Sequence, residues 1–204
     1  MPMHIDVNAI CQLHQDTVES WHHQEVDNPY DGLLSVVCQQ HQFNFLLWHE
    51  EDIARSPDVG DKKIAAVKRA IDGYNQKRND WIEKIDDWIT GQLMELRIAP
   101  ATDAKQNTET PGSAMDRLSI MSLRIYHMLE QLERTDASDS HLDSVRQKLA
   151  RCYEQKTDLA NSLTELLGDI YAGRKQHKTY RQFKMYNDPN LNPYLYQPSD
   201  RRAA

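Results

Sequence analysis

The sequence lacks most of the patterns by which common enzyme classes are recognised. Its 204 residues include only seven glycines and three cysteines, with no glycine-rich phosphate loop, no GxSxG motif and no CxxC pair. The most apolar window, residues 43–48, is far too short to cross a bilayer, so no membrane span is predicted. Cys11, Cys38 and Cys152 are odd in number and widely separated, which predicts reduced, half-buried thiols and not zinc ligands or disulfides.

The charge balance also limits the partners that we expect. A net charge of -7 disfavours non-specific binding to nucleic acid by the body of the protein. The first ten residues, MPMHIDVNAI, have neither the basic start nor the apolar core of a secretory signal. We therefore expect a cytoplasmic protein for which nucleic acid is not a partner.

Apolar residues recur at helical spacing in five segments that are separated by polar turns. The predicted helices span residues 6–22, 30–55, 62–89, 114–134 and 141–172, and Gly173 is placed to stop the last one. No segment shows the alternation typical of strands, and the short connections favour antiparallel neighbours. The predicted fold is all-α, an antiparallel bundle of about five helices that occupies residues 1–173.

Residues 174–204 differ from the bundle in composition and are predicted to form a basic, Tyr/Pro-rich extended arm. The segment holds seven basic residues: Arg174, Lys175, Lys178, Arg181, Lys184, Arg201 and Arg202. Pro189, Pro193 and Pro198 exclude a continuous helix across its second half. Two interpretations are open: an arm whose tyrosines pack on the bundle or on a neighbouring subunit, or a clamp for a phosphate-bearing ligand or RNA.

The second and third predicted helices become polar where their buried stripes should be apolar. Asn75 and Arg78 interrupt a regular run of isoleucine and valine in the third helix. The stripe of the second helix passes Trp48 and then continues with Asp52 and Arg55. A charged side chain is rarely directed toward a core unless a partner neutralises it. The sequence therefore predicts a polar spot between these two helices.

Two interpretations of the polar spot remain open. In one, Asp52 and Glu51 pair with Arg78 or Lys68 in a buried salt-bridge network that fixes the register of the helices. In the other, the cluster lines a cleft for a small anionic or polyhydroxyl ligand, which a guanidinium held by packing binds well. The candidate ligand-binding residues are Trp48, Glu51, Asp52, Arg55, Asn75, Arg78, Asn79, Arg117 and His127.

A Pro-Gly turn precedes the fourth predicted helix, within the segment ETPGSAMDR at residues 109–117. Free amides at the start of a helix form a natural anion site. Asp116 lies close to this helix start, so we expect its carboxylate to satisfy those amides.

Metal chemistry has little support in the sequence. Glu83 and Asp86 form one ExxD pair, but the second helix lacks the ExxE partner that helical nucleotide pyrophosphatases use to hold magnesium. His127 and Glu130 form only a reversed version of the ExxH motif of di-iron proteins. No metal or cofactor is therefore predicted, and no catalytic residue is assigned.

Four segments in order resemble a known family: NFLLWHEEDIAR, VKRAIDGYNQKRNDWIEKID, ETPGSAMDRLSIMSLRIYHM and YRQFKMYNDPNLNP. Together they are similar to the bacterial domain-of-unknown-function family 4254, over residues 44–196. The resemblance implies a bacterial protein of unestablished activity, whose relatives tend to be encoded among genes for envelope polysaccharide synthesis. It supplies no catalytic residue, but it places Asp116 and the candidate residues named above inside the family's motifs.

These observations lead to one hypothesis and two alternatives. The hypothesis is a binding or accessory protein of envelope glycan synthesis, a homodimer, with an interhelical pocket for an anionic sugar or nucleotide-type ligand. The first alternative is a small helical hydrolase or transferase that uses acidic and histidine side chains, with or without a divalent metal. The second is a protein–protein scaffold without a small-molecule site, in which the arm carries the partner contact.

Overall fold

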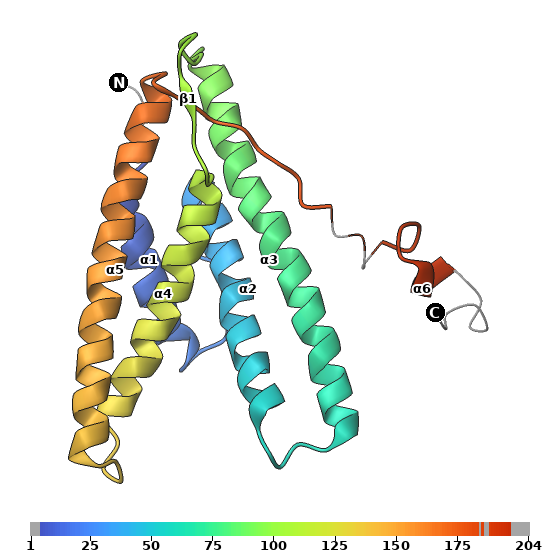
Figure 1. Ribbon diagram of the computed structural model, residues 1–204, viewed down its shortest axis with the longest axis vertical. Coiled ribbons are helices and arrows are strands. Elements are labelled where there is room, and N and C mark those ends of the chain that lie inside the picture. The colour runs from blue at the N-terminus through green and yellow to red at the C-terminus, as the bar shows by residue number, and fades with distance from the viewer. Residues whose placement is uncertain (1–4, 184, 186–187, 197–204) are drawn as a thin grey trace.

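The computed structural model describes residues 5–183, 185 and 188–196, and helices dominate them (Figure 1). The long helices are α1 (Val7–Trp21), α2 (Gly32–Arg55), α3 (Asp61–Glu95), α4 (Pro111–Leu132) and α5 (Asp139–Tyr171); α6 (Pro193–Tyr196) is a single turn. The predicted all-α bundle of five substantial helices is confirmed. None of the helices in the described part of the chain is long and apolar enough to span a membrane.

Local chemistry explains where several helices begin and end. The Asp6 side chain caps α1 by accepting from the amides of Asn8 and Ala9 at 2.9 and 3.2 Å. The Thr110 hydroxyl caps α4 in the same way, at 3.2 Å from the Ser113 amide. Gly173 ends α5 with a φ of 71°, a conformation that favours glycine. The largest difference is α3, which continues past the predicted end at residue 89 to Glu95; its last four residues, Gln92, Leu93, Met94 and Glu95, are good helix formers.

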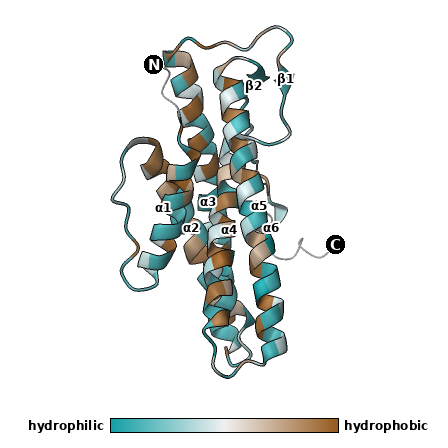
Figure 2. Ribbon diagram, turned by 90° about the vertical axis from the view of Figure 1, so that its left-hand side faces the viewer, coloured by the Kyte–Doolittle hydropathy of each residue, from teal (hydrophilic) through white to brown (hydrophobic). Residues whose placement is uncertain are grey.

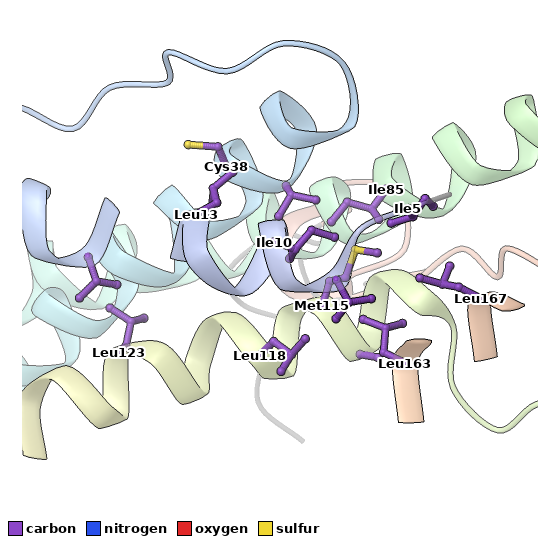
Figure 3. Close-up of a cluster of buried hydrophobic side chains, with 14 of the residues drawn as sticks. Ile5, Ile10, Leu13, Cys38, Ile85, Met115, Leu118, Leu123, Leu163 and Leu167 are labelled. Atoms are coloured by element: carbon purple, nitrogen blue, oxygen red, sulfur yellow. The ribbon is translucent and has the colours of Figure 1, made fainter. Parts of the chain in front are cut away.

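The helices form two antiparallel hairpins, α2 with α3 and α4 with α5, and α1 packs against α2, α4 and α5 (Figure 1). Apolar and hydrophilic residues alternate along each helix at helical spacing (Figure 2), as expected when one side of each helix is buried. Ile10 of α1, Ile85 of α3 and Met115 of α4 are fully buried at 0% exposure and point toward one another (Figure 3). The bundle therefore has one main core, to which α1, α3 and α4 all contribute.

A two-stranded parallel sheet joins the loop after α3 to the start of the arm. Strand β1 (Lys105–Gln106) pairs with β2 (Lys175–Gln176). Strands of two residues are too short to produce an alternating pattern, so no strand was predicted here. Next to the sheet, Gly173 accepts from the Ala101 amide at 2.9 Å, and a Cβ at Gly173 would lie 2.9 Å from the Ala99 carbonyl oxygen. The sheet and this close contact fix the start of the arm to the bundle.

The arm then crosses α3. His177 bonds through Nε2 to the carbonyl of Asp86 at 3.0 Å, and Arg181 forms ion pairs with Glu83 and Asp87 at 3.0 and 2.9 Å. Farther along, the described residues extend away from the bundle (Figure 1). The division into a 1–173 bundle and a 174–204 arm stays a prediction, and Lys184, Pro198, Arg201 and Arg202 lie outside the described residues.

The three cysteines are free, as predicted. Cys11 is half-buried, whereas Cys38 and Cys152 are buried more completely than the sequence suggested. Burial raises the pKa of the Cys38 thiol to about 12, so this side chain is an inert apolar group.

Candidate functional site

The polar interruption in α2 and α3 converges on one carboxylate of α4, that of Asp116. Arg78 donates to it through both Nε and Nη2, with Nε 2.8 Å from Oδ1. Asn44 and Gln40 donate to the same Oδ1 from 2.9 and 2.6 Å. Asp116 is only 4% exposed, and charge-assisted bonds of this kind are the strong ones in a low-dielectric interior. The carboxylate therefore joins three helices.

The network continues through the Ser119 hydroxyl. Asn44 donates to it at 2.7 Å, and Nδ1 of His41 lies 2.6 Å away. His41 is fully buried, and this burial lowers its pKa to about 3, so its imidazole is neutral at physiological pH. The network thus contains two charged groups, the carboxylate of Asp116 and the guanidinium of Arg78. Its other members, Gln40, His41, Asn44 and Ser119, are neutral.

The partners predicted for this buried salt-bridge network are wrong: Arg78 pairs with Asp116 of α4, and Lys68 pairs with Asp72 of its own helix at 2.7 Å. Glu51 pairs instead with Arg55 at 2.6 Å on its own helix, and the two side chains are 39% and 70% exposed. Spacing along two helices identifies positions that face inward, but it does not show that a third helix supplies the partner. Arg78 was correctly placed toward the interior, and its counter-ion comes from α4.

The predicted role of Asp116 at the start of α4 is also wrong. The carboxylate there belongs to Asp86 of α3, whose Oδ1 accepts from the Gly112 amide at 2.8 Å. Asp86 is 3% exposed; burial raises its pKa, while the bonds from Thr110 and Gly112 oppose that rise. A Cβ at Gly112 would lie 2.6 Å from the Ile82 carbonyl oxygen. This close approach of α4 to α3 brings Asp116, one turn later, beside Arg78.

A cleft of about 410 Å³ opens beside this network, between α2, α3 and α4. Five of the candidate residues line it: Trp48, Glu51, Asp52, Arg55 and Arg78. The rest of the lining consists of Asn44, Leu47, Ile120 and Leu123. The Arg78 side chain is 24% exposed, and in the described part of the chain its Nη1 makes no hydrogen bond. One edge of a guanidinium that is fixed by Asp116 is therefore free to bind a ligand.

The other candidate residues lie elsewhere. Asn79 turns its amide back to the carbonyl of Asn75 at 2.8 Å, so these two are not part of the cleft lining. Arg117 lines a second, larger groove of about 790 Å³ between α4 and α5 and pairs with Glu109 at 3.0 Å. His127 stacks on Trp48 with ring centroids 5.0 Å apart.

His127 has two histidine neighbours in the fold. His22, which directly follows α1, and His49 of α2 each offer a ligand atom, and the three ligand atoms lie within 4.8 Å of one another. The residues are 27 and 78 positions apart along the chain and follow no metal-binding spacing. The only local signal was His127 with Glu130, which the structure joins by a 2.6 Å contact.

Taken together, the fold and the cleft define the class as an all-α bundle protein with a charged network buried between three helices. The comparison with family models matches residues 34–179 to the family described as "Protein of unknown function (DUF4254)", and the chain belongs to this family. The match contains Arg78, Asp116, His49 and His127, whereas α1 and the tail motif from residue 180 onward lie outside it. No curated protein and no solved structure matches the chain.

Proposed function

We propose that this protein binds a small anionic sugar or sugar-nucleotide ligand in the cleft between α2, α3 and α4. The observation that carries the proposal is the fixed guanidinium of Arg78, held on one side by buried Asp116 and open to the cleft on the other. A guanidinium that is already immobile loses little conformational entropy when it binds a phosphate or carboxylate.

The charge of the cleft indicates how the ligand is held. Asp116 neutralises Arg78, so Arg78 alone attracts an anion only moderately. Arg55 supplies a second positive charge in the cleft, and its ion pair with Glu51 is exposed to solvent. Exposed pairs of this kind contribute only about 0–1 kcal/mol, so an anion displaces Glu51 from Arg55 at small cost.

The rest of the lining suits a sugar. Trp48 offers an indole against which the apolar face of a sugar ring can pack, and the carboxylates of Glu51 and Asp52 can accept from its hydroxyl groups. The mixture of one aromatic residue, acceptors and guanidinium groups favours a ligand that is polyhydroxylated and anionic together. A cytoplasmic accessory role in envelope glycan synthesis, which the family resemblance suggested, is part of this proposal.

Calorimetric titration tests the proposal. The full chain is titrated with a panel of sugar nucleotides, sugar phosphates and uronic acids, with inorganic phosphate as the simplest probe. We expect at least one anionic sugar to bind, and Arg55→Ala to weaken its binding at least about ten-fold, as loss of one charged contact of about 1.4 kcal/mol requires.

Arg117→Ala is the matched control, because it removes an exposed arginine with a similar acidic partner on the other groove. It should leave the affinity unchanged. The proposal is overturned if no member of the panel binds, or if the two arginine variants weaken binding equally.

A further inference from the structure

Three histidines from three different elements meet at one point of the bundle. His22 follows the last turn of α1, His49 lies in the second half of α2, and His127 lies in the second half of α4. Their ring centroids are 5.1, 5.2 and 5.7 Å apart in pairs. All three residues are half-buried, so the surrounding side chains restrain the cluster.

Hydrogen bonds fix the same tautomer in each ring. Nδ1 of His22 lies 2.6 Å from the Val18 carbonyl oxygen, and Nδ1 of His49 lies 2.8 Å from that of Phe45. Nδ1 of His127 lies 2.6 Å from a carboxylate oxygen of Glu130. Carbonyl and carboxylate oxygens only accept, so each Nδ1 carries the proton and each Nε2 keeps a lone pair.

No hydrogen bond among the described residues explains why two of these Nε2 atoms are buried. Those of His22 and His127 are buried without a hydrogen-bond partner among the residues that the structure describes. A buried acceptor without a partner destabilises the fold. Two buried acceptors without a donor, beside the imidazole of His49, form an environment that a cation satisfies.

Aromatic packing holds the rings but does not account for the lone pairs. His22 stacks on Tyr126 at 4.0 Å and His127 on Trp48 at 5.0 Å. Phenylalanine would make the same stacking contacts without burying a polar nitrogen.

We propose that His22, His49 and His127 bind one Zn²⁺ ion through their Nε2 atoms, with a fourth position open to water or another ligand. Zn²⁺ favours tetrahedral nitrogen coordination at about 2.0–2.1 Å, which places ligand nitrogens about 3.3 Å apart. One ligand atom of each ring already lies within 4.8 Å of those of the other two, so the rings must move closer together to hold the ion. The Val18 and Phe45 carbonyls and the Glu130 carboxylate serve as the outer shell that orients metal-bound histidines.

This site is independent of the anionic ligand, although Trp48 connects the two by lining the cleft and stacking on His127. It departs from the sequence prediction that no metal is bound. Three histidines spread over the first, second and fourth helices escape detection by spacing, because only the tertiary fold brings them together.

The test uses the full chain, stripped of metal with a chelator and then titrated with Zn²⁺ in competition with a chromophoric chelator. We expect one Zn²⁺ per chain and a higher melting temperature. Co²⁺ in place of Zn²⁺ should give the visible absorption of a tetrahedral nitrogen site. His49→Phe and His127→Phe keep an aromatic ring and remove the ligand nitrogen, so each should weaken Zn²⁺ binding at least a hundred-fold.

Two further variants separate a built site from surface binding. Glu130→Gln should retain one site and weaken it about ten-fold, as loss of an outer-shell carboxylate does. His23→Phe changes the exposed histidine next to His22 and should have no effect. Lack of stoichiometric Zn²⁺ binding, or equal binding by His127→Phe and the unchanged chain, overturns the proposal.

Discussion

Asp116 accepts from Arg78, Asn44 and Gln40 while being almost completely removed from water. The sequence revealed that Arg78 points inward, because it interrupts a regular apolar stripe. It did not reveal the partner, because Asp116 belongs to another helix and the pairing depends on the depth at which α4 approaches α3. Single residues that break a pattern are therefore predictable, whereas the contacts that compensate for them come from tertiary packing.

Removing the charge of Asp116 should destabilise the protein strongly. Asp116→Asn leaves the guanidinium of Arg78 beside a neutral amide, and an uncompensated charge that is mostly buried costs about 3–5 kcal/mol. Urea denaturation measures the change in the free energy of unfolding. The control is Asp72→Asn, which breaks the exposed pair with Lys68 and should cost less than about 1 kcal/mol. Equal losses for the two variants would contradict a special role for the buried pair.

Two buried histidines predict that the protein loses stability as the pH falls. Burial lowers the pKa of His41 to about 3, from an ordinary value of 6.5, and lowers that of His14 well below 6.5; nearby Lys156 of α5 opposes protonation further. Between the pKa of each histidine in the folded chain and its ordinary pKa of 6.5, the imidazole is protonated in the unfolded chain and neutral in the folded chain. The stability contributed by each neutral ring is therefore complete above pH 6.5 and decreases below it, by up to about 1.4 kcal/mol per pH unit.

His14→Leu should make that pH dependence shallower. In the described part of the chain neither ring nitrogen of His14 has a hydrogen-bond partner, so leucine loses no bond and removes a titrating group. We expect equal or higher stability near neutral pH and a smaller decrease between about pH 6.5 and about pH 5. Urea denaturation at several pH values measures both. An unchanged slope would show that His14 is already protonated in the fold or does not titrate in the unfolded chain.

At the scale of elements, five apolar stripes and their polar turns were sufficient to predict the long helices. The residues that set helix depth were harder to recognise. Gly112 looked like part of a Pro-Gly turn, but its main role is to let α4 approach the Ile82 carbonyl of α3. Strands β1 and β2 were missed because two residues give no periodic signal.

Gly112→Ala should weaken the contact between α3 and α4. The added methyl group would lie 2.6 Å from the Ile82 carbonyl oxygen and 3.0 Å from the Asp86 carboxylate, so the helices must separate. We expect a loss of about 1–3 kcal/mol in the free energy of unfolding, as for other overpacked sites. Gly91→Ala, on the open side of α3, should instead raise it by about 0.5–1 kcal/mol through helix propensity. Similar effects of the two changes would contradict the close approach.

At the scale of the whole molecule, the arm combines a part that is bound to the bundle with a part that exposes apolar side chains. Its first part is fixed to α3 by His177 and Arg181. Beyond that part, large apolar side chains are exposed, among them Phe183 at 85% and Tyr194 at 59%. Exposed apolar groups in succession favour burial against another surface. We propose that a second copy of the chain supplies this surface.

Deleting residues 183–204 tests the proposed homodimer. The shortened chain keeps β2, His177 and Arg181, so its bundle should remain folded with a melting temperature close to that of the full chain. Sedimentation should show a dimer for the full chain and a monomer for the shortened one. A full chain that remains monomeric at all concentrations would exclude this arrangement.

The position of Asp116 has a consequence for the growing chain during translation. Ribosomes release α2 and α3 before α4, so until α4 emerges the chain lacks the carboxylate that pairs with Arg78 in the folded protein. Two unfinished hairpins that met by the sides carrying Arg78 would bring like charges together, which opposes their association. When α4 packs against its own hairpin, Asp116 neutralises Arg78 and the repulsion ends. Until then, the positive charges oppose association between nascent chains.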